Sequence, residues 1–384
     1  MKYMGSKRWM LGNGLGTKLK IELKGAKRFF DLFSGSGSVA GYVAEHSRVP
    51  VFAYDLQEFS AVLSRAVIGR KRALDGKKLW KKWRKRATRW VTLIRPTVVE
   101  TVSKRTVRRA RNWSRRQSKY PFVRAYGGHY YSPRQAAWIQ ALRATAPNRE
   151  PHKSVALAAL IEGASRCAAA PGHTAQPFQV TRTAKKYLKV SWSLDVAQQV
   201  RDALIALCAR HAKRAGQAFV GDANVIAKKL KKGDLAFVDP PYSGVHYSRF
   251  YHVLEGIAQG KIGRVSGVGR YPARKARPRS AYSVKSESYK AIGELLNAIA
   301  DKGARAIVTF PNSEASNGLS GAKIRRMANE RFWLDHNTVE GRFSTLGGNG
   351  RLSRTGNKRK ARQLSKEMIL VLRPRAAHRG RTVQ

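Results

Sequence analysis

Short apolar segments alternate with helical ones in the first seventy residues, and this feature most constrains the fold of the chain. An apolar segment at residues 28–33 leads into a turn rich in Gly and Ser and then a helical pattern, which together span residues 34–45. A second apolar segment at residues 49–54 ends at Asp55, and a second helical pattern follows at residues 59–68. Strand and helix signals in alternation predict a parallel sheet with helices on both faces.

The same pattern returns in the second half of the chain. Further helices are expected at residues 135–144, 155–170, 195–215 and 288–301. We expect five more strands, at residues 218–221, 234–238, 304–310, 332–339 and 367–372. With the two N-terminal strands these make seven, so the expected fold class is α/β, with a doubly wound, seven-stranded and mostly parallel sheet.

A strongly basic segment separates these two halves. Residues 70–119 contain 20 Lys or Arg and only two acidic residues. Apolar side chains at helical spacing predict an amphipathic helix, and we expect this stripe to pack in the core rather than against bases; it consists of Trp80, Trp83, Ala87 and Trp90. The opposite face is expected to bind phosphate through Lys81, Lys82, Arg84, Lys85 and Arg86.

The charge of the chain points to a nucleic-acid partner. The sequence has 76 Lys and Arg against 23 Asp and Glu, a formal net charge of +53, and the surplus is interleaved with aromatic residues. A polyanion relieves repulsion of this size. A solubilised basic surface and a membrane-surface binder are the alternatives that charge alone leaves open.

Composition also argues against several classes of protein. Cys167 and Cys208 are the only cysteines, and they have neither CxxC nor His-paired spacing, so neither a disulfide framework nor a metal site is expected. No apolar run reaches the roughly 18 residues needed to span a bilayer, and the N-terminus lacks a signal-like apolar region. We expect a cytoplasmic monomer with no membrane partner.

The strongest chemical signal is a buried apolar strand that runs into Asp239, Pro240, Pro241 and Tyr242. This arrangement places the acid at the carboxyl end of a strand, where open α/β sheets bind ligands. The prolines remove two backbone donors, so the Asp239 carboxylate and the Pro240 carbonyl are left to accept hydrogen bonds from an aromatic amino group. Such an amine is a poor nucleophile, and these acceptors favour its pyramidal transition state. Tyr242 is placed to stack on a base swung out of a helix.

These motifs resemble those of the Dam-like DNA adenine methyltransferases, in which cofactor motifs come first, then a recognition region, then Asp-Pro-Pro-Tyr. The resemblance rests on residues 2–7, 31–39, 239–242 and 246–255, and on 347–351 leading into 367–370. It implies a methyltransferase-type sheet and transfer of a methyl group from S-adenosylmethionine to the exocyclic amino group of adenine in double-stranded DNA. It also implies a prokaryotic or phage-encoded, nucleoid-associated enzyme of the restriction-modification kind.

The resemblance also carries roles onto particular residues. Tyr3 and Lys7 are expected to contact S-adenosylmethionine, with Lys7 as a cation for the methionine carboxylate. The glycines after Asp31 allow close backbone approach to the methionine moiety. The complete set expected to bind the cofactor is Tyr3, Gly5, Lys7, Asp31, Phe33, Gly35, Gly37, Asp55, Asp222 and Asp239. Arg351 joins the residues expected to bind nucleic acid.

Two of these aspartates have a second interpretation. Asp55 is placed to bind ribose hydroxyls, as an acid does at this position in dinucleotide sites, or to cap the helix that follows. Asp222 is placed to accept a hydrogen bond from the cofactor's adenine amino group, or is a simple turn residue. His129, His246 and His252 are expected to be structural, hydrogen-bonded histidines.

We therefore divide the chain into three regions. Residues 1–69 form the cofactor-binding part, residues 70–150 a basic helical insert for target recognition, and residues 151–384 the remainder of the catalytic domain. Basic loops are expected at residues 260–286 and 342–362, the second of them mobile.

Other functions fit the same motifs. The acceptor geometry also serves methylation of a cytosine amino group in DNA or of adenine in RNA. A non-catalytic nucleic-acid binder on a methyltransferase scaffold is the third alternative.

Overall fold

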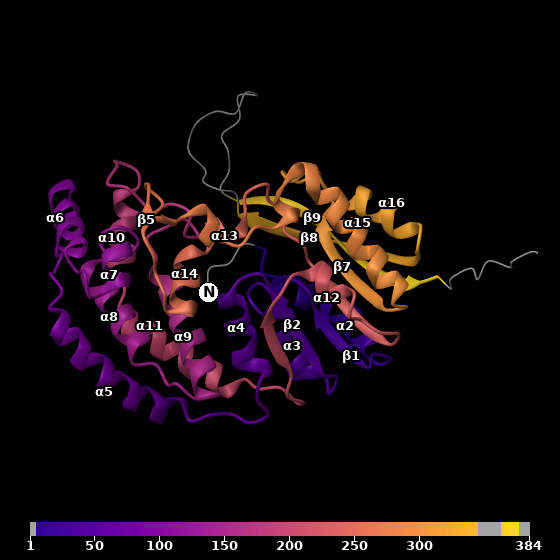
Figure 1. The fold of residues 1–384 in the computed structure, drawn as a ribbon, viewed down its shortest axis with the longest axis horizontal. Helices are drawn as coiled ribbons and strands as arrows, with labels where there is room; N and C mark the ends of the chain where they lie inside the picture. The colour runs from indigo at the N-terminus through magenta and orange to yellow at the C-terminus, as the bar shows by residue number, and fades with distance from the viewer. Residues whose placement is uncertain (1–4, 345–361, 376–384) are drawn as a thin grey trace, which may run out of the picture.

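The computed structural model of the chain describes residues 5–344 and 362–375, and places the side chains of residues 5–340 and 366–375. Its centre is a seven-stranded sheet in the order β3-β2-β1-β4-β7-β9-β8 (Figure 1). The strands are β1 (Arg28–Asp31), β2 (Val51–Asp55), β3 (Gln217–Val220), β4 (Asp234–Val238), β7 (Arg305–Pro311), β8 (Phe332–Ser344) and β9 (Arg362–Pro374). A separate two-stranded hairpin pairs β5 (Val265–Ser266) with β6 (Tyr271–Pro272).

Helices precede, interrupt and follow the strands. The N-terminal ones are α1 (Arg8–Met10), η1 (Leu11–Leu15), α2 (Gly16–Leu23), α3 (Ser38–His46) and α4 (Glu58–Ile68). Between α4 and β3 lie α5 (Gly76–Ile94), α6 (Lys104–Arg115), α7 (Pro121–Tyr126), α8 (Pro133–Ala144), α9 (His152–Cys167), α10 (Lys185–Ser193) and α11 (Val196–Ala209). The others are α12 (Ala223–Ala227), α13 (Tyr247–Phe250), α14 (His252–Gln259), η2 (Arg274–Ala276), η3 (Ala281–Ser283), α15 (Lys285–Asp301) and α16 (Gly321–Asn329).

The sheet is mostly parallel, with one reversed strand near its edge. β1 pairs in parallel with β2 and β4, β2 with β3, and β4 with β7. β9 runs antiparallel to both β7 and β8. The expected α/β class with a seven-stranded, mostly parallel sheet is therefore confirmed, and the order is consistent with the methyltransferase fold. Because β1 and β4 are neighbours, their carboxyl ends meet at one edge of the sheet.

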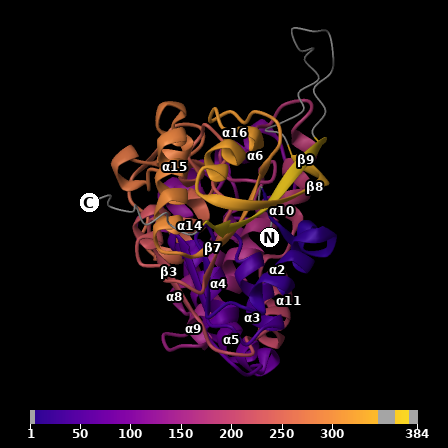
Figure 2. The same ribbon diagram turned by 90° about the vertical axis from the view of Figure 1, so that its right-hand side faces the viewer.

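Strand residues alternate between two apolar layers, since successive side chains of a strand point to opposite faces. In β4, Leu235 and Phe237 pack in the layer that contains α2 and α3, whereas Ala236 and Val238 pack in the layer that contains α12, α15 and α16. Figure 2 shows α15 on one side of β7 and α2 on the other. This two-sided covering is the doubly wound arrangement.

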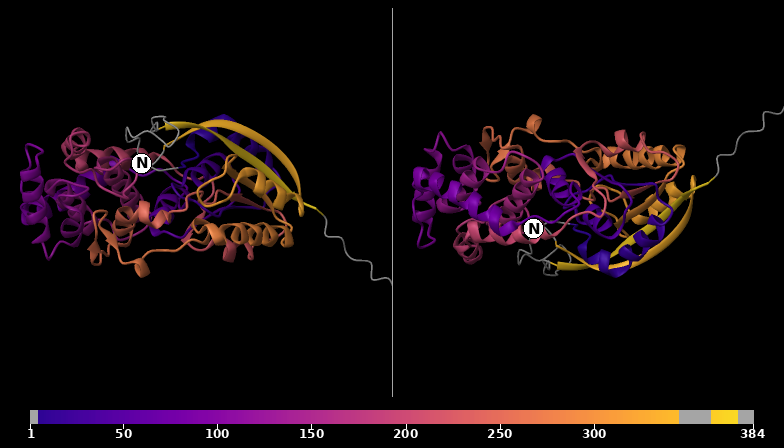
Figure 3. Two further views of the ribbon diagram at one scale, coloured as in Figure 1. Left: turned by 90° about the horizontal axis from the view of Figure 1, so that it is seen from above. Right: turned by 90° about the horizontal axis from the view of Figure 1, so that it is seen from below.

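Among the helices between α4 and β3, α5, α7, α8, α9 and α11 share a third core with α4 and α14, whereas the buried apolar residues of α6 and α10 belong to a smaller fourth one. The helical part and the sheet lie at opposite ends of the molecule (Figure 3). Trp83 is fully buried and its indole N–H donates to the Leu142 carbonyl at 3.0 Å, so the stripe expected on α5 is core at Trp80 and Trp83. At Trp90 the expectation is wrong, since the side chain is 38% exposed.

Several boundaries differ from those expected. The helix expected to reach residue 215 ends at Ala209, because the chain then turns to enter β3, with the Gly216 N–H donating to the Ile68 carbonyl. β8 and β9 pair as far as Ser344 and Arg362, so the ends of the loop expected at residues 342–362 are strand; the rest of that loop lies outside the described residues. The helices from α5 to α11 continue past residue 150, the expected end of the basic insert.

Candidate active site

A pocket lies at the carboxyl ends of β1, β2 and β4. Eleven residues expected from the sequence line it: Gly5, Lys7, Asp31, Phe33, Gly35, Asp55, Asp222, Asp239, Pro240, Pro241 and Tyr242. Gly37 lies just behind this wall, where a Cβ would approach Ser64 to 3.0 Å. Tyr3 and Arg351 lie outside the described residues.

Asp239 follows β4 directly, and its two carboxylate oxygens have different surroundings. Oδ1 accepts a hydrogen bond from the Thr309 hydroxyl at 2.8 Å and lies 3.0 Å from the Lys7 ammonium. Oδ2 accepts no hydrogen bond from the described part of the chain. One oxygen is thus held by the protein while the other is left as an acceptor facing the pocket.

Lys7 connects Asp239, at the end of β4, to a second carboxylate. Its ammonium lies 3.0 Å from Glu367 Oε2 as well as from Asp239, and the side chain is only 4% exposed. Glu367 belongs to β9, which pairs with β7 beside β4. Neither Glu367 nor Thr309 was expected in the site, although an acid that opens an apolar strand beyond a glycine-rich loop is a signal that sequence reasoning can use.

Burial and charge act in opposite directions on this group of residues. Burial lowers the pKa of Lys7, but Asp239 and Glu367 outweigh burial, so the pKa rises and the ammonium stays charged. Burial raises the pKa of Asp239, Glu367 raises it further, and Lys7 opposes both. Lys7 therefore opposes the effect of burial on the pKa of Asp239 and favours its carboxylate form.

A buried amide fixes the turn after Asp239. The Asn317 side chain, which is fully buried, donates to the Pro241 carbonyl at 2.9 Å and to the Tyr282 carbonyl at 3.0 Å. The Pro240 carbonyl, in contrast, accepts no hydrogen bond from the described residues. Local sequence patterns carry no signal for Asn317, because its role depends on a long-range contact between two loops.

Tyr242 contacts the N-terminal segment. Gly5 has φ 74°, and a Cβ there would lie 2.9 Å from the Tyr242 hydroxyl oxygen, so only glycine fits without displacement. The Tyr242 ring meets the Phe310 ring edge to face at 6.4 Å, and its hydroxyl is hydrogen-bonded to Tyr247. The N-terminal segment and the tetrapeptide are therefore parts of one wall.

The glycine-rich loop follows β1 and leaves an acid at its base. Asp31 Oδ2 accepts from the Ala40 N–H at 3.1 Å, whereas Oδ1 is buried with no hydrogen-bond partner among the described residues. Burial, with the charge of Asp239 second, raises the pKa of Asp31 to about 8. Gly35 and Gly37 have φ of 49° and 69°, which lets the backbone turn tightly over this carboxyl group.

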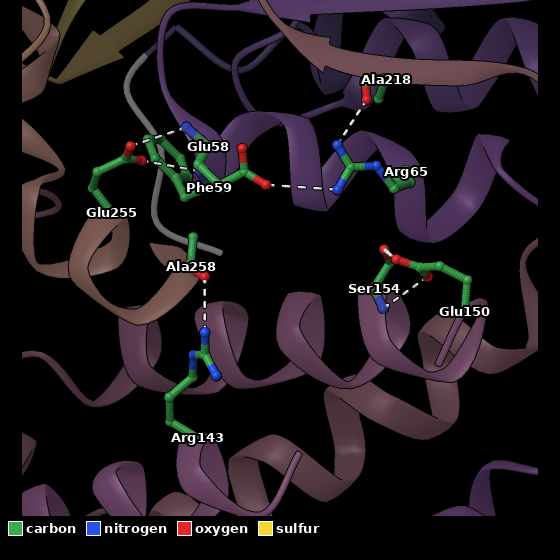
Figure 4. A network of polar contacts seen from close by, with 9 residues as sticks. All are labelled: Glu58, Phe59, Arg65, Arg143, Glu150, Ser154, Ala218, Glu255 and Ala258. Carbon is green, nitrogen blue, oxygen red and sulfur yellow. Dashed lines mark hydrogen bonds and ion pairs between the residues drawn. The ribbon is translucent and has the colours of Figure 1, made fainter. Parts of the chain in front are cut away.

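Asp55 ends β2 and joins two loops of the pocket. Its Oδ2 accepts from the Gly35 N–H at 2.9 Å and its Oδ1 from the Gln57 N–H at 3.0 Å. Burial raises its pKa to about 6. Asp55 does not cap the first turn of α4, because Glu255 accepts from the Glu58 and Phe59 N–H groups, both at 3.0 Å (Figure 4).

The other expected residues have mixed outcomes. Asp222 caps α12 by accepting from the Asn224 and Val225 N–H groups, so it serves at least as a turn and cap residue at the pocket wall. Phe33 packs edge to face on Tyr282, with ring centroids 5.1 Å apart.

The basic face of α5 is exposed but lies away from this pocket. Lys81, Lys82, Arg84, Lys85 and Arg86 are all exposed. Figure 1 shows α5 along the side of the molecule opposite α13, which borders the pocket. Binding of DNA by these side chains therefore stays a prediction.

The three histidines sit in structural surroundings. His246 Nδ1 accepts from the Ser280 N–H at 3.3 Å, and His252 Nδ1 is bonded to the Arg249 carbonyl at 3.1 Å. Burial lowers the pKa of His252 to about 4 and that of His129 to about 3, the latter aided by neighbouring arginines. Both are neutral at physiological pH.

The fold and this pocket are consistent with the α/β methyltransferase fold: a glycine-rich loop follows β1, an acid ends β2 and Asp-Pro-Pro-Tyr follows β4. Residues 168–289 match the family of D12 class N6 adenine-specific DNA methyltransferases. It is 25% identical over 319 residues to modification methylase LlaI of Lactococcus lactis subsp. lactis, an alignment that covers 78% of this chain and 44% of that protein. The chain thus spans less than half the length of this relative.

Two features of the described residues bear on partners. None of the helices in the described ranges is long and apolar enough to cross a membrane. No group of three or more His, Cys, Asp or Glu side chains suited to a metal ion occurs in the same part of the chain.

Proposed function

We propose that the protein transfers a methyl group from S-adenosylmethionine to the exocyclic amino group of adenine in double-stranded DNA. The observation that carries this proposal is the pair of acceptors after β4: Asp239 Oδ2 and the Pro240 carbonyl accept nothing from the described residues and belong to the wall of one pocket. The match of residues 168–289 to the D12 class supports adenine in DNA over other aromatic amines.

The residues around the pocket fit S-adenosylmethionine, which when bound supplies an electrophilic methyl group on a sulfonium ion. Asp31 Oδ1, buried without a partner among the described residues, suits the cationic amino group of its methionine moiety. The turn at Gly35 lets backbone approach the same moiety. Asp55 and Asp222 retain lone pairs for the ribose hydroxyls and the adenine amino group of the cofactor.

Lys7 acts chiefly on Asp239 in this proposal. Its ammonium is paired with the Asp239 and Glu367 carboxylates, so it orients the Asp239 carboxylate and favours its charged form. An ammonium has three donors, and the third remains for the methionine carboxylate that the sequence resemblance assigned to it.

The two acceptors prepare the target amine. Asp239 Oδ2 and the Pro240 carbonyl would each accept a hydrogen bond from the amino group, which favours a pyramidal nitrogen whose lone pair can attack the methyl carbon as the carbon–sulfur bond breaks and S-adenosylhomocysteine leaves. The N-methylated product cation is strongly acidic and loses a proton to water. Tyr242, with its hydroxyl fixed by Tyr247, offers its ring to a base turned out of the duplex.

The test uses tritiated S-adenosylmethionine, duplex DNA and digestion to nucleosides. We expect label in N6-methyl-2′-deoxyadenosine for the natural protein and none for Asp239→Ala. Asp335→Asn, which alters an acid paired with Lys18 away from the pocket, is the matched control and should retain activity. Label in cytosine, or unchanged transfer by Asp239→Ala, would contradict the proposal.

The alternatives are separated in the same assay. Preferred transfer to single-stranded RNA over duplex DNA in competition favours an RNA substrate. Absence of any heat of cofactor binding in calorimetry favours a non-catalytic binder on this scaffold.

A further inference from the structure

Two arginine side chains pack against one tyrosine ring at the rim of the pocket. The guanidinium carbons of Arg249 and Arg277 lie 4.8 and 5.6 Å from the centroid of the Tyr271 ring. In the chain each is the neighbour of a residue that lines the pocket, Ser248 and Pro278 respectively. This arginine pair, Arg249 and Arg277, therefore lies where a substrate enters the site.

The tyrosine beneath the arginine pair is firmly anchored. The Tyr271 hydroxyl donates to the Ala175 carbonyl, and the His252 ring packs 5.0 Å from the Tyr271 ring. The preceding residue, Arg270, has φ 53°, in the left-handed region that side chains seldom adopt. Its Nε donates to the Ala125 carbonyl at 2.8 Å, which ties the hairpin to α7. The arginine pair thus rests on a fixed platform rather than on a free loop.

The arginine pair lacks counter-charges. Arg279, close by in the chain, is paired with Glu287, but neither Arg249 nor Arg277 forms an ion pair within the described residues. Arg277 Nε is buried with no hydrogen-bond partner there. Burial lowers the pKa of Arg277, and the charge of Arg249 lowers it further. A bound anion relieves this repulsion.

Further arginines extend the basic surface onto the helical part. Burial lowers the pKa of Arg270, and the charges of Arg115 and Arg124 add to this effect. Burial and the charge of Arg270 do the same to Arg111. Figure 1 shows β5 and α13 along one side of the molecule and α5 along the other. The surface continuous with the pocket is therefore the hairpin side and not α5.

We propose that the arginine pair binds the phosphodiester groups that flank the target nucleotide. A guanidinium group stacked on an aromatic face keeps its in-plane N–H donors, which match the oxygens of a phosphate. A nucleotide turned out of the duplex brings its flanking phosphates to the rim of the pocket that receives its base. This inference rests on the proposed function and adds to it the side chains that hold the strand.

The test measures how the affinity for a fluorescent 30-base-pair duplex of random sequence depends on salt. Each phosphate contact contributes a slope of roughly −0.9 in log K against log salt. We expect the Arg249→Gln/Arg277→Gln double variant to bind more weakly and to have a shallower slope, by an amount equal to about two phosphate contacts. Arg325→Gln/Arg326→Gln on α16 removes the same charge from a distant exposed surface and should leave the slope unchanged. Equal slopes in the two double variants would overturn the proposal.

Two further measurements make the outcome decisive. Calorimetry with S-adenosylmethionine should give wild-type affinity for the arginine variant, which shows that the pocket is folded. Arg249→Lys/Arg277→Lys keeps the charge but loses the planar donors, so we expect the salt slope to persist while the affinity falls. Wild-type affinity in this variant would contradict phosphate contacts that depend on guanidinium groups oriented by the tyrosine ring. If no methyl reaches adenine, the proposed function fails, whereas the salt slopes still decide the role of the arginine pair.

Discussion

The Lys7 ammonium lies 3.0 Å from Asp239 Oδ1, which joins the N-terminal segment to the end of the central strand β4. Glu367 holds the same ammonium from β9, so one buried cation lies between two carboxylates. Burial raises the pKa of Asp239, and the Lys7 charge opposes that rise. The acceptor strength of the catalytic acid consequently depends on residues at both ends of the chain.

Lys7→Met should impair both catalysis and stability. Removal of the cation leaves two buried carboxylates unpaired, and breaking a buried ion pair costs about 3–5 kcal/mol. The pKa of Asp239 rises further in this variant, so the acidic limb of the pH–rate profile should move to higher pH. Denaturant unfolding and kcat measured from pH 5 to pH 9 check both expectations.

Glu367→Gln should shift the acidic limb of the pH–rate profile in the opposite direction. Because the charge of Glu367 raises the pKa of Asp239, its removal should move the acidic limb to lower pH while Lys7 stays paired with Asp239. A shift of both variants in one direction would mean that Lys7 and Glu367 act only through folding.

Much of this site follows from the sequence, because its residues lie at strand ends that local patterns reveal. Asp31, Asp55 and Asp239 each end a short apolar run, and such runs in alternation with helices bring their carboxyl ends together. Thr309 and Glu367 depend instead on how β7 and β9 pair with the rest of the sheet. Local spacing carries no information on that register.

The helical part was less predictable for a similar reason. The apolar stripe on α5 predicts one buried side of the helix, and Trp83 is buried there. Trp90 belongs to the same stripe but is exposed, because its burial depends on tertiary packing that the spacing does not encode. The hairpin of β5 and β6 has two residues in each strand and a basic sequence, too short for an alternating pattern to appear.

Asp31 should make both stability and cofactor affinity depend on pH. Its pKa in the folded protein is raised to about 8 from an ordinary value of 3.8. Between these values the unfolded chain ionises Asp31 and the folded one does not, so its contribution to stability is lost as pH rises through this window. Asp31→Asn should flatten this decline, as urea unfolding at pH 5 and pH 8 measures.

Cofactor binding should reverse that preference, since a cationic amino group favours the ionised Asp31 carboxylate. The affinity for S-adenosylmethionine is expected to rise from pH 6 to pH 8 with release of a proton, detected by calorimetry in buffers of different ionisation enthalpy. An affinity independent of pH in this range would place the amino group elsewhere.

Asn317→Ala should slow transfer without weakening cofactor binding. The substitution leaves the Pro241 and Tyr282 carbonyls without their donor, and an unsatisfied buried acceptor costs about 1–3 kcal/mol. The turn after Asp239 then loses its fixed position, so kcat should fall while the cofactor Kd stays the same. Asn329→Ala on α16, where the amide only meets Arg375 at the surface, is the control and should change neither.

Neutralising Lys81, Lys82, Arg84, Lys85 and Arg86 together should weaken DNA binding and leave cofactor binding intact. Because α5 lies away from the pocket, the loss should appear as lower affinity in salt titrations with kcat at saturating DNA unchanged. Unaltered affinity would show that this helix does not meet DNA.

Glu255→Gln should loosen the junction between the helical part and the cofactor pocket. The Glu255 carboxylate accepts from the N–H groups of Glu58 and Phe59, which begin α4 just after the loop of Asp55. Hydrogen bonds to a charged group contribute about 1.5–3 kcal/mol each, and an amide offers a single acceptor oxygen, so one backbone donor is left unsatisfied.

We therefore expect Glu255→Gln to lower the free energy of unfolding and to weaken S-adenosylmethionine binding, because the Asp55 loop loses the support of the α4 N-terminus. Glu294→Gln on α15, an exposed acid paired with Lys290, is the matched control and should stay within about 0.5 kcal/mol of the natural protein. Reduced stability with undiminished cofactor affinity would show that Glu255 supports α4 alone, and that the position of Asp55 is fixed by its own bonds to Gly35 and Gln57.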